Sequence, residues 1–232
     1  MNINKCTRAI MWGGILSFTC HTVSATIVSG AVTGGQSLTQ GGTFVKLTVP
    51  FTNSDPDNTV GNDTFEDPNL YGFDEGQNID ISVDLAVDIL ADGMGGSSGS
   101  GIVPMGSTVA SHYIFFDPAA TTGGTTQVGT VSFDSDIFGI ITSTSNLAAS
   151  DFLINTGVTY LNPTLRGLES GDSATITGLQ TITVDWRAGT PGDYIRVLTD
   201  FSPGAVPIPA SVWLFGSGLF GIVGIARRKK AS

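Results

Sequence analysis

The stretch Ile79-Asp80-Ile81-Ser82-Val83-Asp84-Leu85-Ala86-Val87-Asp88-Ile89 decides the fold class of this chain, because apolar residues hold its odd positions and mostly polar residues its even ones. A period of two is typical of a β-strand with one buried face, whereas a helix would spread these side chains around its whole surface. We therefore expect residues 79–89 to form a strand with Asp80, Asp84 and Asp88 on its solvent face.

Further runs along the chain have the same β-rich composition of Val, Ile, Thr and aromatic residues, bounded by Gly, Asn, Asp and Pro. They are 43–49, 109–116, 127–133, 151–154, 158–161, 173–177, 181–187 and 194–199, with 138–142 as a weaker candidate. A short helical turn is expected at 145–150. Short strands without a long amphipathic helix predict an all-β body, an antiparallel β-sandwich or jelly roll.

The predicted body, residues 26–201 with a linker at 202–205, is long enough for one hydrophobic core. It is strongly acidic. Residues 26–205 hold four basic residues and all twenty acidic ones, a formal charge of −16. Such a surface repels nucleic acid and anionic lipid, and it favours solubility and contact with divalent cations.

The N-terminus has the layout of a secretory signal peptide. Lys5 and Arg8 precede an apolar stretch at 9–20, and Val23 and Ala25 supply the small residues that signal peptidase needs. Cleavage after Ala25 would remove residues 1–25 and start the mature chain at Thr26.

The two cysteines, Cys6 and Cys20, both fall within the predicted signal peptide. The mature body would therefore hold neither a thiol nor a disulfide, and packing alone would stabilise it. Phe18 argues against a lipoprotein site at Cys20, because a lipobox needs small residues there.

The C-terminus is a second targeting segment. It consists of the motif Val206-Pro207-Ile208-Pro209, an uncharged apolar run at 210–226, and the cations Arg227, Arg228, Lys229 and Lys230. The prolines favour an extended chain, and a helix over the apolar run would span roughly 26 Å, the short end of what crosses a bilayer. Because the cations would stay on the cytoplasmic side, the body is expected beyond the inner membrane.

This order of proline motif, short apolar helix and basic end resembles the PEP-CTERM sorting signal of Gram-negative bacteria. The tail departs from it at Ile208, where the name-giving motif carries Glu, and is similar there to VPxP-type variants. The resemblance implies that an exosortase, an integral-membrane Cys-dependent enzyme, recognises the motif at 206–209 and cuts there. An ordinary C-terminal anchor is the alternative.

Segments of the body resemble secreted bacterial proteins that often carry this tail. The resemblance rests on residues 58–65, 69–78 and 111–118, and it extends through 155–172 and 191–197. It implies an extracellular β-domain and brings no catalytic residues with it.

The acid-rich loop at 55–67 is the best candidate for a binding site. Calcium takes six to eight oxygen ligands, which flexible loops rich in Asp and Asn can supply. The expected ligands are Asp55, Asp57, Asp63, Glu66 and Asp67. Val60 stands where an EF-hand needs Gly, so an EF-hand is excluded. The alternative is that these acids are solvated turn formers.

Catalytic groups are scarce. His112 is the only histidine after the predicted signal peptide, which excludes a His-rich zinc site and forces any Ser-His-Asp triad to use it. We expect it to be a half-buried strand residue. No GxSxG elbow or phosphate-cradling glycine pattern is present, and paired carboxylates for glycoside hydrolysis stay open.

These observations favour an exported, non-enzymatic cell-surface or extracellular-matrix protein, processed by an exosortase-like enzyme and associated with exopolysaccharide or biofilm. The alternative is an extracellular carbohydrate-binding or glycan-hydrolysing β-sandwich. A sugar site would need exposed aromatic rings on one face. The available rings are Tyr71, Phe73, Tyr113, Phe115, Phe116, Tyr160, Trp186 and Tyr194.

Overall fold

The computed structural model describes residues 24–91 and 100–201, which belong to one compact unit. Most of the predicted signal peptide, the linker at 202–205 and the sorting tail at 206–232 lie outside the described residues, and so does Val23. Within the described ranges, no helix has the length and apolar character to span a bilayer.

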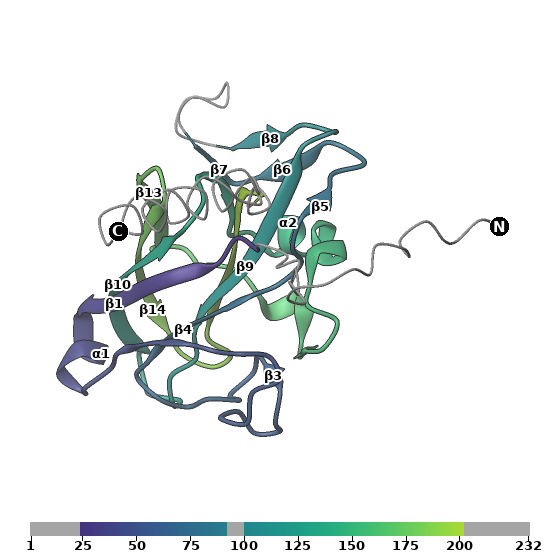
Figure 1. The fold of residues 1–232 in the computed structure, drawn as a ribbon. Coiled ribbons are helices and arrows are strands. Elements are labelled where there is room, and N and C mark those ends of the chain that lie inside the picture. Colours follow the sequence, from purple (N-terminus) through teal and green to yellow (C-terminus); the bar gives the residue numbers. More distant parts are fainter. Residues whose placement is uncertain (1–23, 92–99, 202–232) are drawn as a thin grey trace, which may run out of the picture. The chain divides into compact units, whose positions relative to one another are not determined.

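The described residues form an all-β body with several sheets (Figure 1). Sheet A is antiparallel and has four strands. In spatial order they are β1 (Ile27–Gly34), β10 (Thr125–Phe133), β14 (Thr181–Ala188) and β13 (Ser173–Gly178). Strand β1 thus joins sheet A through a partner about a hundred residues further along, with Ile27 opposite Phe133.

Sheet B is larger and is built around the long strand β9, the teal arrow in the middle of Figure 1. Its order is β2 (Phe44–Lys46), β4 (Leu70–Asp74), β9 (Thr108–Phe116), β15 (Asp193–Asp200), β11 (Ile137–Ile141) and β7 (Ile89–Leu90), and β5 (Ile79–Asp80) also pairs with β9. Only the β2–β4 pair of this sheet is parallel.

Two small sheets and four short helices complete the described body. Strand β12 (Thr159–Tyr160) pairs in parallel with β3 (Thr59–Val60), and β6 (Leu85–Val87) pairs with β8 (Gly101–Val103). The helices are α1 (Gly35–Thr39), α2 (Thr144–Ala149) and the 3₁₀ turns η1 (Asp151–Leu153) and η2 (Pro163–Leu165).

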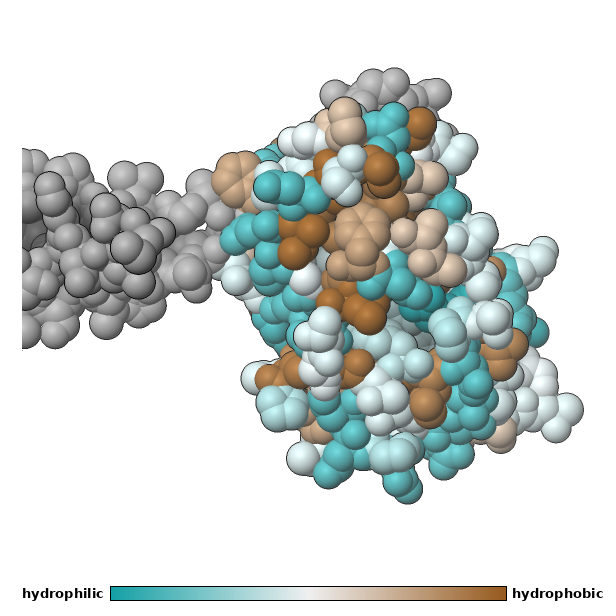
Figure 2. All heavy atoms as spheres, turned by 90° about the vertical axis from the view of Figure 1, so that its right-hand side faces the viewer, coloured by the Kyte–Doolittle hydropathy of each residue, from teal (hydrophilic) through white to brown (hydrophobic). Residues whose placement is uncertain are grey.

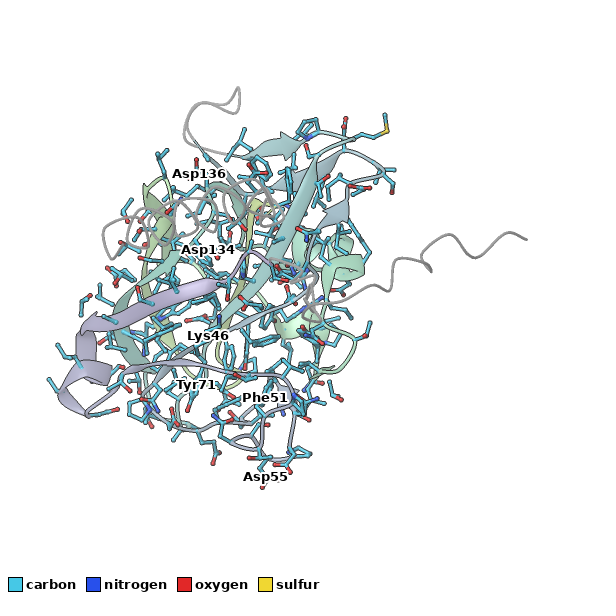
Figure 3. All side chains as sticks on the ribbon, in the orientation of Figure 1. Lys46, Phe51, Asp55, Tyr71, Asp134 and Asp136 are labelled. Atoms are coloured by element: carbon cyan, nitrogen blue, oxygen red, sulfur yellow. The ribbon has the colours of Figure 1, made fainter. Side chains whose placement is uncertain are left out.

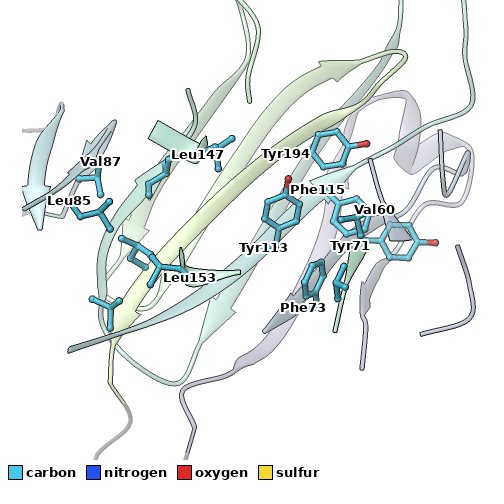
Figure 4. Packing of buried hydrophobic residues seen from close by; sticks show 14 of the residues in the cluster. Val60, Tyr71, Phe73, Leu85, Val87, Tyr113, Phe115, Leu147, Leu153 and Tyr194 are labelled. Atoms are coloured by element: carbon cyan, nitrogen blue, oxygen red, sulfur yellow. The ribbon is translucent and has the colours of Figure 1, made fainter. Parts of the chain in front are cut away.

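Two hydrophobic clusters lie on opposite faces of sheet B. Successive side chains of a strand alternate between faces, and Ile114 and Phe116 of β9 pack in one cluster with Val184 and Trp186 of sheet A. Their neighbours Tyr113 and Phe115 pack in the other cluster (Figure 4), which also takes in Leu147 and Leu153 from the segment after β11. Every residue of β9 from Val109 to Phe116 is therefore buried.

The stretch 79–89 keeps its predicted alternation but is not one strand. Ile81, Leu85 and Val87 are buried, whereas Val83 is 63 % exposed. The chain is divided among β5, β6 and β7, which pair with β9, β8 and β11 in turn. The alternation of apolar and polar residues shows which side chains are buried. It does not show that the stretch pairs with three different strands in turn.

Asp88 departs from its predicted place on a solvent face. Its carboxylate accepts the backbone N–H groups of Thr142 and Ser143 at 2.7 and 2.8 Å, and the side-chain amide of Asn146 at 2.7 Å. Asp88 therefore fixes the start of α2.

Most of the other predicted elements are present. Strands β2, β9, β10, β11, β12, β13, β14 and β15 and helix α2 occur where the sequence predicts them. The expected strand at 151–154 is wrong, because residues 151–153 form η1. Asp151, the first residue of η1, accepts two hydrogen bonds from the guanidinium of Arg166, with both N–O distances 2.8 Å. This pairing holds the segment in a turn instead of a strand.

Several large apolar side chains of the body are exposed. On the side of the molecule in Figure 2, brown and tan atoms gather within a teal and white surround. The exposed residues are Val28, Leu38, Val83, Ile102, Met105, Phe152, Leu165, Leu179 and Phe201. Exposed apolar residues are ordinary on a folded domain and do not by themselves identify a partner.

Candidate functional site

The five predicted calcium ligands do not gather into one group. Asp55, Asp57 and Glu66 are exposed, and Asp55 lies at the outer end of its loop in Figure 3. Asp67 is engaged by protein donors, since it accepts the Tyr71 hydroxyl at 2.5 Å. No cluster of three or more His, Cys, Asp or Glu side chains that could hold a metal occurs among the described residues. Of the five, only Asp63 retains a buried oxygen without a hydrogen-bond partner.

The residues that follow Asp63 instead contact Asp117, which lies outside the predicted loop. Asp117 directly follows β9 and is fully buried. Its Oδ2 accepts the backbone N–H of Thr64 at 2.8 Å, the Thr64 hydroxyl at 3.3 Å and the N–H of Phe65 at 3.1 Å. Its Oδ1 has no partner among the described residues. Asp63 immediately precedes Thr64 in the chain, and its charge acts on the Asp117 carboxyl.

Burial dominates the electrostatics of Asp117. The pKa of its carboxyl is raised to about 6: loss of water and the charge of Asp63 raise it, and the N–H groups of Thr64 and Phe65 lower it. Burial and the nearby charge of Asp63 thus both favour the neutral form of Asp117.

The turn before β15 closes over Asp117. Gly192 has φ +91°, and a Cβ there would lie 2.7 Å from the Phe116 carbonyl oxygen, 3.0 Å from the Tyr194 hydroxyl and 3.1 Å from the Asp117 Cα. Burial and then the charge of Asp117 raise the pKa of Tyr194. The Tyr194 hydroxyl, which donates to the Pro191 carbonyl, thus lies close to Asp117, and glycine permits the close approach.

A second arrangement joins an acid, a histidine and a hydroxyl. His112 Nδ1 is 2.8 Å from Asp74 Oδ1, and its Nε2 is 3.0 Å from Thr199 Oγ1. This is the order of groups in a hydrolytic triad. However, His112 and Thr199 are both fully buried, deeper than the half-buried position that the sequence predicts. No substrate could reach the hydroxyl in this conformation.

Asp74 also fixes the start of the predicted mature chain. It accepts the Thr26 hydroxyl at 2.7 Å and the Ile27 N–H at 3.0 Å, and it pairs with Lys46 Nζ at 2.9 Å. Burial alone would raise the pKa of Asp74, but His112, with the donors Thr26 and Lys46, lowers it well below its usual range.

Thr26 is held at its backbone nitrogen as well, which donates to Asp134 Oδ1 at 2.7 Å. Ala25, on the other side of the predicted cleavage bond, is fully buried. Signal peptidase would therefore have to act before β1 docks on the body.

The aromatic residues that could have formed a sugar-binding platform are in the core. Seven of the eight are buried, with exposed fractions between 0 and 3 %, and Tyr160 is partly buried. Several pack against each other, as with Tyr113 and Tyr194, whose rings stack 6.0 Å apart (Figure 4). A carbohydrate-binding face would need exposed aromatic rings, and these eight residues do not provide them.

Comparisons with known proteins add no identification: no family model, no curated protein and no solved structure matches this chain.

Sequence reasoning missed Asp117, although a signal for it exists. The acid stands at the end of the run Tyr113-Ile114-Phe115-Phe116, which is apolar on both strand faces. A strand buried on both faces carries its next residue into the interior as well. A buried acid needs hydrogen-bond donors or a positive charge, so an acid in that position is a candidate for a special role. This reasoning would have singled out Asp117.

Proposed function

We propose that this chain is an exported, non-enzymatic protein of the cell surface or extracellular matrix. An N-terminal signal peptide directs it across the inner membrane, its C-terminal helix anchors it transiently, and an exosortase-like enzyme cuts it at residues 206–209. The mature body associates with exopolysaccharide. We also infer that sheets A and B form its β-sandwich, jelly-roll-like core, because one hydrophobic cluster takes side chains from both.

The observation that carries this proposal is the anchoring of Thr26. The residue predicted to begin the mature chain uses its backbone nitrogen, its hydroxyl and the next N–H to contact Asp134 and Asp74. After cleavage the nitrogen would become a cationic amine beside a carboxylate, which strengthens such a contact. A body that fixes Thr26 in this way fits a chain from which residues 1–25 are removed.

The non-enzymatic part of the proposal draws support from burial. The Asp74–His112–Thr199 chain has no face open to solvent at the histidine or the hydroxyl. A panel of glycoside and ester substrates tests this part directly, and reproducible turnover that the His112→Gln variant abolishes would refute it.

Intact-mass analysis of the protein from a Gram-negative cell with the cognate exosortase tests the sorting. The secreted chain should begin at Thr26, end within 206–209 and lack Trp213. The double variant Pro207→Ala/Pro209→Ala should stay uncut and membrane-bound, because it loses the extended motif. Replacing residues 227–230 by Ser should disturb orientation or retention.

Pro203→Ala supplies the matched control, since it removes a proline outside the motif. It should be processed like the natural chain. An extracellular protein that still carries residues 227–232 would contradict the sorting role.

A further inference from the structure

We propose that one end of the body lies against a zwitterionic lipid surface while the C-terminal segment anchors the chain. We call this surface the exit end, and it comprises residues 26–28, 133–137, 178–180 and 200–201. The inference rests on the anchoring step of the proposed function and deepens it, because it names the part of the body that meets the membrane and the class of lipid that it meets.

The start of β1 and the end of β15 meet at one turn, which contains Asp134 and Asp136 (both labelled in Figure 3). The Thr26 nitrogen donates to Asp134 Oδ1 at 2.7 Å, and the Asp134 N–H donates to the Thr26 carbonyl at 3.1 Å. On the other side of the turn, the Asp200 N–H donates to the Asp136 carbonyl at 2.7 Å. The chain therefore enters β1 and leaves β15 at the same place.

The exit end also carries exposed apolar side chains. Leu179, in the hairpin between β13 and β14, is 75 % exposed, and its carbonyl accepts the Ile137 N–H at 2.8 Å. Phe201 directly follows β15 and is 43 % exposed, and Val28 near the start of β1 is 59 % exposed. Three exposed apolar residues thus belong to segments that the same turn holds together.

The length of chain beyond Phe201 points to the occupant of this surface. Eight residues, 202–209, separate Phe201 from the apolar run at 210–226. Fully extended, eight residues span at most about 29 Å. With the apolar run in a bilayer, the point where the chain leaves the body cannot move further than this from the lipid surface.

The short tether makes weak apolar contacts effective. Leu, Phe and Val side chains bind the boundary between headgroups and acyl chains by burying apolar surface. Three such side chains would bind weakly from solution, but a short linker converts their binding into an intramolecular step with a high effective concentration. The exit end should therefore stay on the lipid for as long as the tail is uncut.

The charge of the exit end favours zwitterionic lipid. Asp134, Asp136 and Asp200 all belong to it, and residues 26–205 have a formal charge of −16. An anionic membrane surface repels carboxylates that lie within a Debye length of it. Contact with anionic lipid should therefore be weaker at low salt and should recover when salt is added.

The test uses the anchored chain, residues 26–232, purified from a cell without an exosortase and reconstituted into phosphatidylcholine vesicles. These residues contain no cysteine, so one introduced cysteine can carry an NBD fluorophore. Gln180→Cys places the label at the exit end, and Thr164→Cys places it in η2; both positions are exposed. Doxyl-labelled lipid should quench the label at residue 180 and leave the label at residue 164 unquenched.

Variants of the exit end separate its side chains from the tether. Leu179→Ser combined with Phe201→Ser should lower the quenching at residue 180 to the level at residue 164, because the apolar contacts are lost. Leu165→Ser is the matched control, since it removes a leucine of η2 that is 52 % exposed, and it should leave the quenching unchanged.

The linker and the lipid composition supply two further comparisons. Inserting about 20 Gly and Ser residues into the linker at 202–205 should reduce the quenching, because effective concentration falls with linker length. Replacing half of the phosphatidylcholine by phosphatidylglycerol should reduce it at low salt and not at high salt. Equal quenching in both lipids at low salt would contradict the preference for zwitterionic lipid.

Vesicle flotation distinguishes failure of this inference from failure of the anchor. A chain that floats with the vesicles but is not quenched at residue 180 is anchored, and the inference about the exit end is then wrong. A chain that does not float has no anchor, and both proposals are then wrong. Undiminished quenching in Leu179→Ser/Phe201→Ser would also overturn the inference. A blue shift of the label at residue 180 without quenching would identify a second copy of the chain as the occupant instead of lipid.

Discussion

The guanidinium of Arg196 and the carboxylate of Glu75 form two hydrogen bonds, of 2.6 and 3.0 Å, with both side chains fully buried. Ser111 and Tyr160 also donate to Glu75, and Arg196 donates to the Leu147 carbonyl. The pair thus ties β15 to the end of β4 and to α2. Burial would lower the pKa of Arg196, but the charge of Glu75 raises it above its usual range.

Removing one partner of this pair should destabilise the body strongly. Arg196→Met leaves Glu75 buried without its counter-charge, and we expect the free energy of unfolding to fall by about 3–5 kcal/mol. Urea unfolding of the full chain measures this. Arg187→Met, an exposed arginine of β14, should change it by less than about 0.5 kcal/mol. Equal losses in the two variants would show that the buried ion pair adds nothing to the stability of the body.

Asp193 should make the body less stable as the pH rises. Burial first, and then the charges of Asp172 and Glu169, raise its pKa from 3.8 to about 8. The folded state therefore binds the proton more tightly than the unfolded state. Its contribution to stability is complete below pH 4 and is lost between about pH 4 and 8.

Asp193→Asn should remove this dependence. It should raise the free energy of unfolding at pH 8 by on the order of 2–4 kcal/mol and change it little at pH 4. Thermal melts across this range provide the comparison, with the exposed Asp185→Asn as a control. If the natural chain and Asp193→Asn have parallel pH profiles, Asp193 does not titrate in this range.

Asp74 should have the opposite effect. Its pKa is lowered in the folded state by His112, despite burial, so its contribution is present at neutral pH and is lost as the pH falls below about 4. Asp74→Asn should therefore cost about 1–3 kcal/mol at pH 7, because His112, Thr26 and Lys46 lose a charged acceptor. The difference from the natural chain should shrink at pH 2–3. Asp80→Asn, which loses one hydrogen bond to an exposed Thr108 hydroxyl, is the comparison.

The mature protein should depend on its new amino terminus. N-terminal sequencing should give Thr-Ile-Val-Ser-Gly. Asp134→Asn should then lower the stability of the mature chain by about 0.5 kcal/mol in a salt-sensitive way, because the amine loses a carboxylate partner at the surface. Asp136→Asn serves as the control, since Asp136 contacts Gln180 and not Thr26. A mature chain that begins elsewhere would remove the basis for this prediction.

Periodicity predicted the class of this fold because burial is what periodicity records. It placed Ile81, Leu85 and Val87 inside correctly, and it could not show that three strands share the stretch, since backbone partners are chosen by distant segments.

The same limit explains the candidate site. The acid-rich loop drew attention to Asp63, but Asp117 is 54 residues away in the sequence, and the pairing of β4 with β9 and the hydrogen bonds from Thr64 and Phe65 bring the two regions together. Composition detects acids that are neighbours in the chain. When the sheet brings distant residues together, the sequence contains only a weak signal, here an acid directly after an apolar strand.

The position of β15 in sheet B determines when during export the larger sheet can form. This strand pairs with both β9 and β11, and it ends at Asp200, just before the predicted linker. A chain emerging from a translocon N-terminus first cannot close its larger sheet until almost all of the body has crossed. A cut within β15 would leave two ladders without their shared strand. The proposed cut at 206–209 would remove no strand of the described body, so the proposed release from the membrane would leave the fold intact.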